Sequence, residues 1–162
     1  MTGPAAMDPP GIDHPANAAL CRWLAGRARP GTPAIARPDR FPRPYESLGT
    51  HPDLVARLWD EIAAVLPVDC RFVVFGAPAL VRPDTGIVFG FACGTHAYAL
   101  RLPENVRRQA VLAGAGRVMT YPRQPPLDLE IIGPEWVFCR WLAGEELWCR
   151  AAFEFATVAA PV

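Results

Sequence analysis

From residue 50 onward, the hydrophobic residues of the chain recur at spacings that are typical of regular secondary structure. Apolar residues three or four positions apart predict helices in three stretches. These stretches are residues 50–66, 103–113 and 145–159. Thr50 and Asp53 resemble a capping box at the start of the first helix, and Pro67 ends it. Gly114 is a typical residue to end the second helix.

Five shorter runs have the composition or the alternation of β-strands. They are residues 70–75, 86–92, 96–102, 127–132 and 135–142. Cys93, Gly94 and Thr95 predict a hairpin turn between the second run and the third. The order of the elements predicts a single α+β domain, in which an antiparallel sheet of about five strands carries three packed helices.

The first 49 residues have a different composition from the rest of the chain. They contain nine of its nineteen prolines, and residues 37–49 resemble extended or polyproline-like chain. One short helix is predicted there, with Asp13 as its cap, Pro15 in its first turn and Gly26 at its end. We therefore expect a Pro/Ala/Arg-rich N-terminal arm over residues 1–49 and an α+β domain over residues 50–160.

The hexapeptide CRWLAG occurs twice, at residues 21–26 and 139–144. The first copy falls in the predicted arm helix, whereas the second ends the predicted strand 135–142, which places Trp141 in the sheet. The flanking residues differ, and no period connects other segments as a repeat architecture requires. We interpret the repeat as a coincidence and expect the two copies to adopt different conformations, because tertiary context overrides local propensity.

Four short motifs occur in an order that is found in a known family. Phe75-Gly76 is followed by Gly86-Ile87-Val88-Phe89 and by Tyr98-Ala99-Leu100-Arg101-Leu102-Pro103, and Trp136-Val137 precedes the last helix. This order is similar to the N-terminal domain of TfoX competence regulators and YjbR-like proteins, over about residues 70–157. The resemblance implies a small α+β domain with no agreed catalytic set, in a regulatory or interaction role.

The charge and cysteine content narrow the class of protein. Sixteen basic residues, all of them Arg, balance sixteen acidic residues, and a nucleic-acid binder usually has a clear basic excess. Five cysteines without paired spacing do not predict a secreted disulfide framework. The N-terminus does not resemble a signal peptide, and no run of eighteen apolar residues predicts a membrane span. We therefore expect a cytoplasmic protein that binds neither membranes nor nucleic acid.

Two pairs of polar residues are candidates for catalysis. Cys93 and His96 flank the predicted hairpin turn, where a thiol and an imidazole would act as nucleophile and base. Asp128 and Glu130 point the same way from the predicted strand 127–132, and paired carboxylates perform acid–base catalysis when their pKa values differ. The alternative interpretations are ordinary turn and strand residues, and a solvated strand face. One Cys-x-x-His pair supplies too few ligands for a structural zinc, so we expect no metal and no cofactor.

Residues 40–45 are the candidate docking element of the arm. Two prolines stiffen this segment, which offers Phe41, Arg43 and Tyr45 to a partner. Phe153 lies off the predicted apolar stripe of the last helix and is a candidate for a partner-facing surface. The alternative is that the arm lies back on the domain, with Phe41 and Tyr45 covering apolar surface.

The sequence therefore predicts a non-catalytic interaction or regulatory module, with a protein partner rather than a nucleic acid. The alternative is a small enzyme that uses Cys93 and His96, or Asp128 and Glu130, in a pocket against the sheet. Neither the partner nor a substrate follows from the residues.

Overall fold

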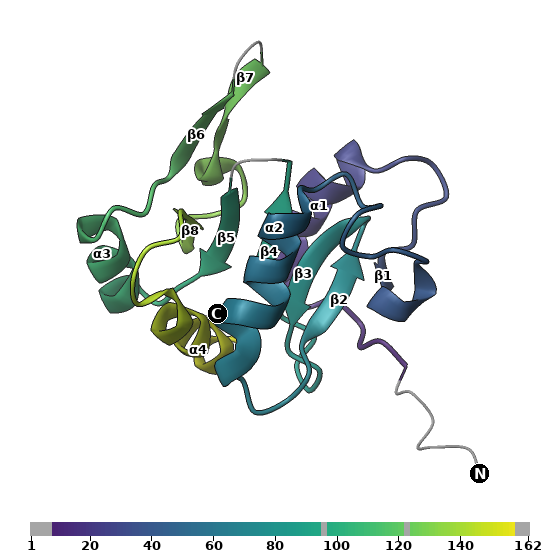
Figure 1. The fold of residues 1–162 in the computed structure, drawn as a ribbon, viewed down its shortest axis with the longest axis horizontal. Helices are drawn as coiled ribbons and strands as arrows, with labels where there is room; N and C mark the ends of the chain where they lie inside the picture. Colours follow the sequence, from purple (N-terminus) through teal and green to yellow (C-terminus); the bar gives the residue numbers. More distant parts are fainter. Residues whose placement is uncertain (1–7, 95–96, 122–123, 158–162) are drawn as a thin grey trace.

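An antiparallel sheet forms the centre of the protein in a computed structural model that describes residues 8–94, 97–121 and 124–157 (Figure 1). Within these residues, six strands lie in the order β1-β2-β3-β4-β5-β8. They are β1 (Ile35–Ala36), β2 (Arg71–Val74), β3 (Ala77–Val81), β4 (Val88–Cys93), β5 (Ala97–Arg101) and β8 (Trp136–Cys139). The predicted α+β class, with an antiparallel sheet and packed helices, is confirmed.

Helices cover both faces of this sheet. They are α1 (Ala18–Arg27), α2 (Pro52–Ala56), α3 (Glu104–Leu112) and α4 (Glu145–Phe155), with short 3-10 turns η1 (Pro15–Asn17), η2 (Pro38–Arg40) and η5 (Leu129–Ile131). Helix α2 continues directly into η3 (Arg57–Glu61) and η4 (Ile62–Val65), and lies in front of the sheet in Figure 1, whereas α1 lies behind it. No helix among the described residues is both long enough and apolar enough to cross a membrane.

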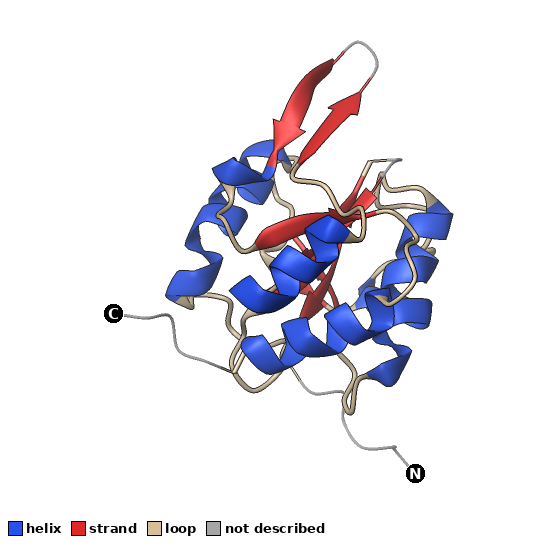
Figure 2. Cartoon of the chain, turned by 90° about the vertical axis from the view of Figure 1, so that its left-hand side faces the viewer, coloured by secondary structure: helices blue, strands red, loops and turns tan. Residues whose placement is uncertain are grey.

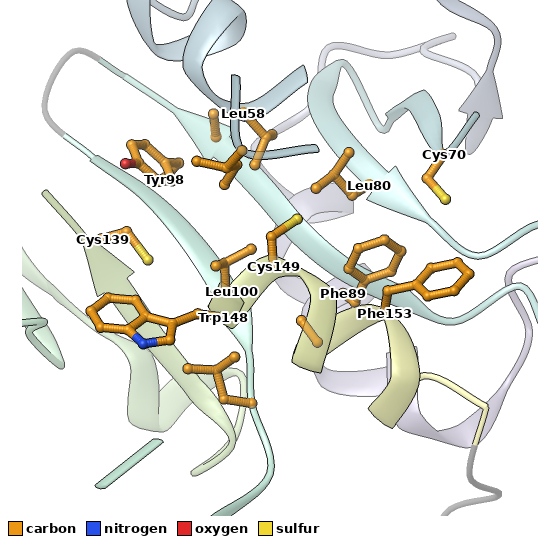
Figure 3. Close-up of a cluster of buried hydrophobic side chains, with 14 of the residues drawn as sticks. Leu58, Cys70, Leu80, Phe89, Tyr98, Leu100, Cys139, Trp148, Cys149 and Phe153 are labelled. Atoms are coloured by element: carbon orange, nitrogen blue, oxygen red, sulfur yellow. The ribbon is translucent and has the colours of Figure 1, made fainter. Parts of the chain in front are cut away.

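Each face of the sheet carries its own hydrophobic cluster, because successive residues of a strand point to opposite faces. On one face, α2 and α4 pack on a cluster that includes Leu80, Phe89 and Leu100 (Figure 3). On the other face, α1 and η5 pack on a cluster that includes Phe91 and Trp136. The sheet is therefore a buried middle layer, and strands of that kind have apolar residues in succession rather than in alternation.

The prediction omitted strand β3. Its run of residues contains Pro78, and a proline argues against a central strand because it has no N–H to donate. In the structure the pairing of β3 with β4 begins at Ala79, so Pro78 lies beyond the paired part on that side. The fully buried run therefore forms a central strand in spite of its proline.

The N-terminal segment packs against the sheet. Helix α1 buries Leu20 and Leu24 in the second cluster, and β1 pairs with β2. The Asn17 side chain is buried and binds the backbone at the start of β4, where its Oδ1 accepts from the Val88 N–H at 2.9 Å. Its Nδ2 donates to the Gly86 carbonyl at 2.8 Å. The predicted short helix is thus present, and the segment that contains it shares its core with the sheet.

Residues 37–49 are not extended as predicted. They contain the 3-10 turn η2 and a second turn, in which the N–H groups of Glu46 and Ser47 donate to the Arg43 carbonyl. Phe41 and Tyr45 pack against the first hydrophobic cluster, as the alternative interpretation of the arm proposed. Successive turns let this short segment cover apolar surface that an extended chain would leave open.

The prediction of a strand over residues 127–132 is wrong in its boundaries. Strand β7 (Gln124–Asp128) pairs with β6 (Val118–Tyr121), and together they form a two-stranded ribbon that projects from the body (Figures 1 and 2). Beyond Asp128 the chain turns into η5, because the Asp128 carboxylate accepts the Glu130 N–H at 2.9 Å and caps that turn. A local side-chain bond therefore ends the strand where the alternation of residues suggested that it continued.

The second CRWLAG copy leaves the sheet earlier than predicted. Strand β8 ends at Cys139, and Trp141 lies outside it with a left-handed backbone (φ 59°) and 46% of its surface exposed. The first copy, residues 21–26, lies within α1. The same six residues thus adopt two conformations, as expected, but the placement of Trp141 in the sheet was wrong.

Both predicted helix caps are displaced by one residue. His51 caps α2 in place of Thr50, since its Nδ1 accepts the Asp53 N–H at 3.1 Å. His14 caps η1 in place of Asp13, since its Nδ1 accepts the Ala16 N–H at 3.0 Å. An imidazole nitrogen thus performs the role that the prediction gave to a hydroxyl and a carboxylate.

A pair of Leu→Ala substitutions tests whether the N-terminal segment contributes to the stability of the fold. Leu20→Ala removes a side chain that is 1% exposed in α1, and we expect it to lower the free energy of unfolding by about 2–5 kcal/mol. Leu112→Ala makes the same chemical change at an 89% exposed position of α3 and should change it by less than about 0.5 kcal/mol. Urea denaturation measures both, and equal effects would contradict the packing of α1.

Candidate functional site

A cavity of about 500 Å³ lies between the N-terminal segment and one end of the sheet. Four parts of the chain line it: the end of α1 with the turn after it (24–32), residues 41–50, the β2–β3 turn (75–77), and the end of β4 (93–94). Its apolar walls include Leu24, Phe41 and Phe75. The cavity is partly open to solvent, and its volume lies within the range of small-molecule sites.

The β2–β3 turn holds Phe75 at the cavity in a strained conformation. Because Val74 pairs with Ala77, only Phe75 and Gly76 connect the strands, and both have positive φ (47° and 83°). A two-residue turn of this type matches the twist of the strands, but a left-handed backbone is unfavourable for a bulky residue. Strained residues cluster at functional sites, which makes Phe75 a candidate binding residue.

A short contact between distant segments joins two walls of the cavity. Thr50 forms a parallel bridge with Gly94, and the His51 N–H donates to the Gly94 carbonyl at 3.0 Å. Residues 41–50 are therefore attached to the end of β4. This attachment holds the end of that segment beside Cys93 and Gly94, which also line the cavity.

The charged residues of the lining have one sign. Arg27 and Arg29 line the cavity, whereas no Asp, Glu or His does so among the described residues. The Arg27 Nη1 donates to the Cys93 sulfur at 3.3 Å, and the same guanidinium lies 4.6 Å from the centre of the Trp23 ring. Cys93 is half-buried. The cavity thus combines apolar walls, two guanidinium groups and one thiol.

The two predicted catalytic pairs differ in their position relative to the cavity. Cys93 lines the cavity, and His96 lies outside the described residues. Asp128 and Glu130 do not share a strand face, because the strand ends at Asp128, and neither of them lines the cavity. Glu130 instead pairs with Arg117 at 3.5 Å. The structure therefore gives these two carboxylates local structural roles.

The four predicted binding residues also separate. Phe41 lines the cavity, whereas Tyr45 is held by a hydrogen bond from its hydroxyl to Asp60 (2.9 Å). Arg43 is exposed, and its Nη1 lies 3.7 Å from the Glu46 Oε2. The prediction of a surface role for Phe153 is wrong, because this residue is 7% exposed and packs in the first cluster (Figure 3). The buried face of α4 is wider than one stripe, since the helix fits between the sheet and η4.

A buried ionic network is the other concentration of titratable groups. Arg57, at the start of η3, donates from Nη2 to the Glu145 carboxylate at 2.8 Å and from Nε to the Tyr98 hydroxyl at 3.1 Å. The Tyr98 hydroxyl donates to the same carboxylate. Tyr98 and Glu145 are fully buried. Sequence analysis missed the network because its members come from η3, β5 and the start of α4.

The network holds the β8–α4 connection in place. The other carboxylate oxygen of Glu145 accepts the Arg140 N–H at 3.0 Å, and the Tyr98 hydroxyl accepts the Trp141 N–H at 3.2 Å. These bonds retain the left-handed backbone of Trp141. Burial, and then the hydrogen bond to Glu145, raise the pKa of Tyr98, so its hydroxyl keeps its proton. Burial opposes the charged form of Arg57, but the bonds to Tyr98 and Glu145 outweigh it and raise the pKa of this guanidinium.

Three thiols lie in the first hydrophobic cluster: Cys70, Cys139 and Cys149 (Figure 3). Burial raises the pKa of each, and that of Cys70 reaches about 12. A thiol that keeps its proton is a poor nucleophile and a poor metal ligand. Within the described residues, no group of three or more His, Cys, Asp and Glu side chains is arranged to hold a metal ion.

Substitutions in the buried network have an expected order of effect. Arg57→Met leaves the buried Glu145 carboxylate without its cation, and we expect the free energy of unfolding to fall by about 3–5 kcal/mol. The double variant Arg57→Met/Glu145→Gln removes both charges and should recover part of this loss. Arg108→Met breaks an exposed pair with Glu104 and should cost less than about 1 kcal/mol. Chemical denaturation compares the three, and an Arg57→Met effect no larger than that of Arg108→Met would refute the assignment.

Comparison of the chain with protein-family models, with curated proteins and with solved structures found no match. The function of the cavity is therefore inferred from its own residues and geometry. The fold determines where the lining residues lie, and the side chains of those residues determine what the cavity can bind.

Proposed function

We propose that this chain is a non-catalytic binding module that holds a small organic molecule in the cavity between the N-terminal segment and the sheet. The observation that carries the proposal is the cavity itself, with a volume of about 500 Å³. Its size lies within the range of roughly 300–1,000 Å³ that is typical of small-molecule sites. Its walls come from segments far apart in the sequence, so the complete fold is needed to form it.

The composition of the lining favours binding over catalysis. A thiol nucleophile needs a base within hydrogen-bond reach, and the described residues place no His, Asp or Glu in the lining. The Arg27 guanidinium donates a hydrogen bond to the Cys93 sulfur. This group is already protonated and has no acceptor site, so it cannot take the thiol proton as a base. Of the small-enzyme alternative, the pair Asp128 and Glu130 does not line the cavity, whereas Cys93 does and its predicted base His96 lies outside the described residues.

A regulatory role is part of the same proposal. The resemblance to the TfoX N-terminal and YjbR-like domain supports a role in regulation or interaction. In such a module, the bound ligand would regulate the binding of a partner. The proposed partner is a protein, since the balanced charge of the chain does not favour nucleic acid. The exposed residues Val118 and Ile131, at the base of the β6–β7 ribbon, are apolar surface that a protein partner would cover.

A substitution that fills the cavity tests the binding function. Ala28 lines the cavity, and Ala28→Trp should weaken binding of the neutral fluorescent probe N-phenyl-1-naphthylamine by about tenfold or more, because the indole occupies its space. Ala25→Trp is the matched control, since Ala25 is exposed on α1 and does not line the cavity. Fluorescence titration measures both affinities.

The two more accessible thiols provide a second readout of the same binding. Bound probe should slow the reaction of Cys93 with a maleimide and leave that of Cys21 unchanged, because Cys21 lies on α1 outside the cavity. Mass spectrometry of the labelled peptides distinguishes the two sites. Loss of binding in both Trp variants, or equal protection of both thiols, would place the probe elsewhere and contradict the proposal.

A further inference from the structure

We infer that the ligand of this cavity is an amphipathic organic anion, in which a carboxylate or phosphate group binds Arg27 and Arg29 and an apolar body occupies the cavity. The inference rests on the proposed function, because it specifies the chemistry of the ligand that the cavity holds. It follows from the charge of the lining, the environment of the two guanidinium groups and the nature of the walls.

The charge of the lining departs from that of the whole chain. The chain has equal numbers of basic and acidic residues, so an average patch is neutral. The cavity lining contains two arginines and, among the described residues, no carboxylate. Helix α1 ends at Arg27 and adds only about half a unit of negative charge there. The cavity is therefore positive, and an anion is the complementary ligand.

About half of the arginines in the described residues have a carboxylate partner. Those in ion pairs are Arg37, Arg43, Arg57, Arg71, Arg82, Arg108, Arg117 and Arg150. Arg27 and Arg29 form no ion pair within the described residues, although both lie beside the same cavity. Guanidinium groups bind carboxylate and phosphate through two parallel hydrogen bonds, which makes these the favoured anions.

Arg27 is exposed, but two contacts orient its side chain before any ligand binds. Its guanidinium stacks 4.6 Å from the Trp23 ring and donates one N–H to the Cys93 sulfur at 3.3 Å. A thiol is a weak acceptor, and the guanidinium has further N–H groups to offer. Because the side chain is already ordered, binding an anion loses less conformational entropy than it would at a free arginine. Arg29, which is exposed, supplies a second charge from the adjacent turn.

The remaining walls suit the apolar part of the ligand. Phe41 comes from the segment before α2, Phe75 from the strained β2–β3 turn, and Leu24 from α1. Aromatic side chains gain from contact with aromatic or alkyl groups beyond the area they bury. A small inorganic anion would leave these walls without a partner, so the anionic group and the apolar body belong to one molecule.

Two fluorescent probes that differ only in charge test the inference. 8-Anilinonaphthalene-1-sulfonate carries one sulfonate on the skeleton of N-phenyl-1-naphthylamine, so the ratio of their dissociation constants isolates the contribution of the charge. We expect the anion to bind wild-type protein about fivefold to tenfold more tightly, as a charged group with two exposed cations would. The preference should shrink as salt is raised, because salt screens exposed charges.

Charge-removing substitutions assign this preference to the two arginines. Arg27→Gln and Arg29→Gln should each reduce it, and together they should abolish it, while affinity for the neutral probe is retained. Arg29→Gln is the more stringent variant, because the Arg29 side chain forms no hydrogen bond or ion pair within the described residues and its loss leaves the fold intact. Arg22→Gln is the matched control: it removes the same charge from the exposed side of α1, away from the cavity, and should leave the preference unchanged.

Displacement of the neutral probe identifies the anionic group. Displacement by 1-naphthoate or 1-naphthyl phosphate, at concentrations where naphthalene has no effect, supports the inference, and the tighter of the two names the group. Equal affinity for the charged and neutral probes, or a preference that survives the double substitution, overturns the inference while the binding function stands. Failure of both probes to bind refutes the proposed function itself.

Discussion

The Asn17 side chain joins the N-terminal segment to the sheet, and the arrangement of the rest depends on that junction. Its amide bonds the backbone on either side of Ile87, and a third bond from Nδ2 to the Ile12 carbonyl (3.1 Å) orders the chain before α1. Gly86 is required beside it, because its φ is 73° and any Cβ would meet the Gly11 carbonyl oxygen. A fully bonded, buried amide is strongly directional, so it fixes where α1 lies on the apolar face.

The cavity is a consequence of this placement. With α1 fixed over the second face, the chain from Ala28 to Thr50 must cross one end of the sheet to reach α2 on the first face. It leaves a partly open cavity there instead of filling the space, and the Thr50–Gly94 bridge forms part of its wall. The same placement brings Arg27 to Cys93. The charge and the apolar walls of the site therefore come from the route of the chain. Binding of an anionic ligand would require the N-terminal segment to follow that route.

Sequence reasoning located the elements whose pattern is local and missed those that depend on distant partners. Helices α3 and α4, and the helical stretch from α2 through η4, were predictable because one apolar face repeats along each. Strand β3 was not, because burial on both faces removes the alternation and Pro78 argues against a strand. The cavity brings together Leu24, Phe75 and Cys93, and no spacing in the sequence connects them. The Arg57–Glu145 pair could not be predicted for the same reason, since 88 positions separate its members.

Native-state hydrogen exchange tests most directly whether the N-terminal segment is a layer of the fold that forms one wall of the binding site. We expect the amides of Leu20 to Leu24 in α1, and the Val88 amide that Asn17 binds, to exchange only through openings as costly as those that expose the centre of β4. Their protection should be lost together as denaturant is added. Exchange of the α1 amides near the rate of an unfolded chain, while β4 stays protected, would show that the segment is a detachable arm and would contradict the account.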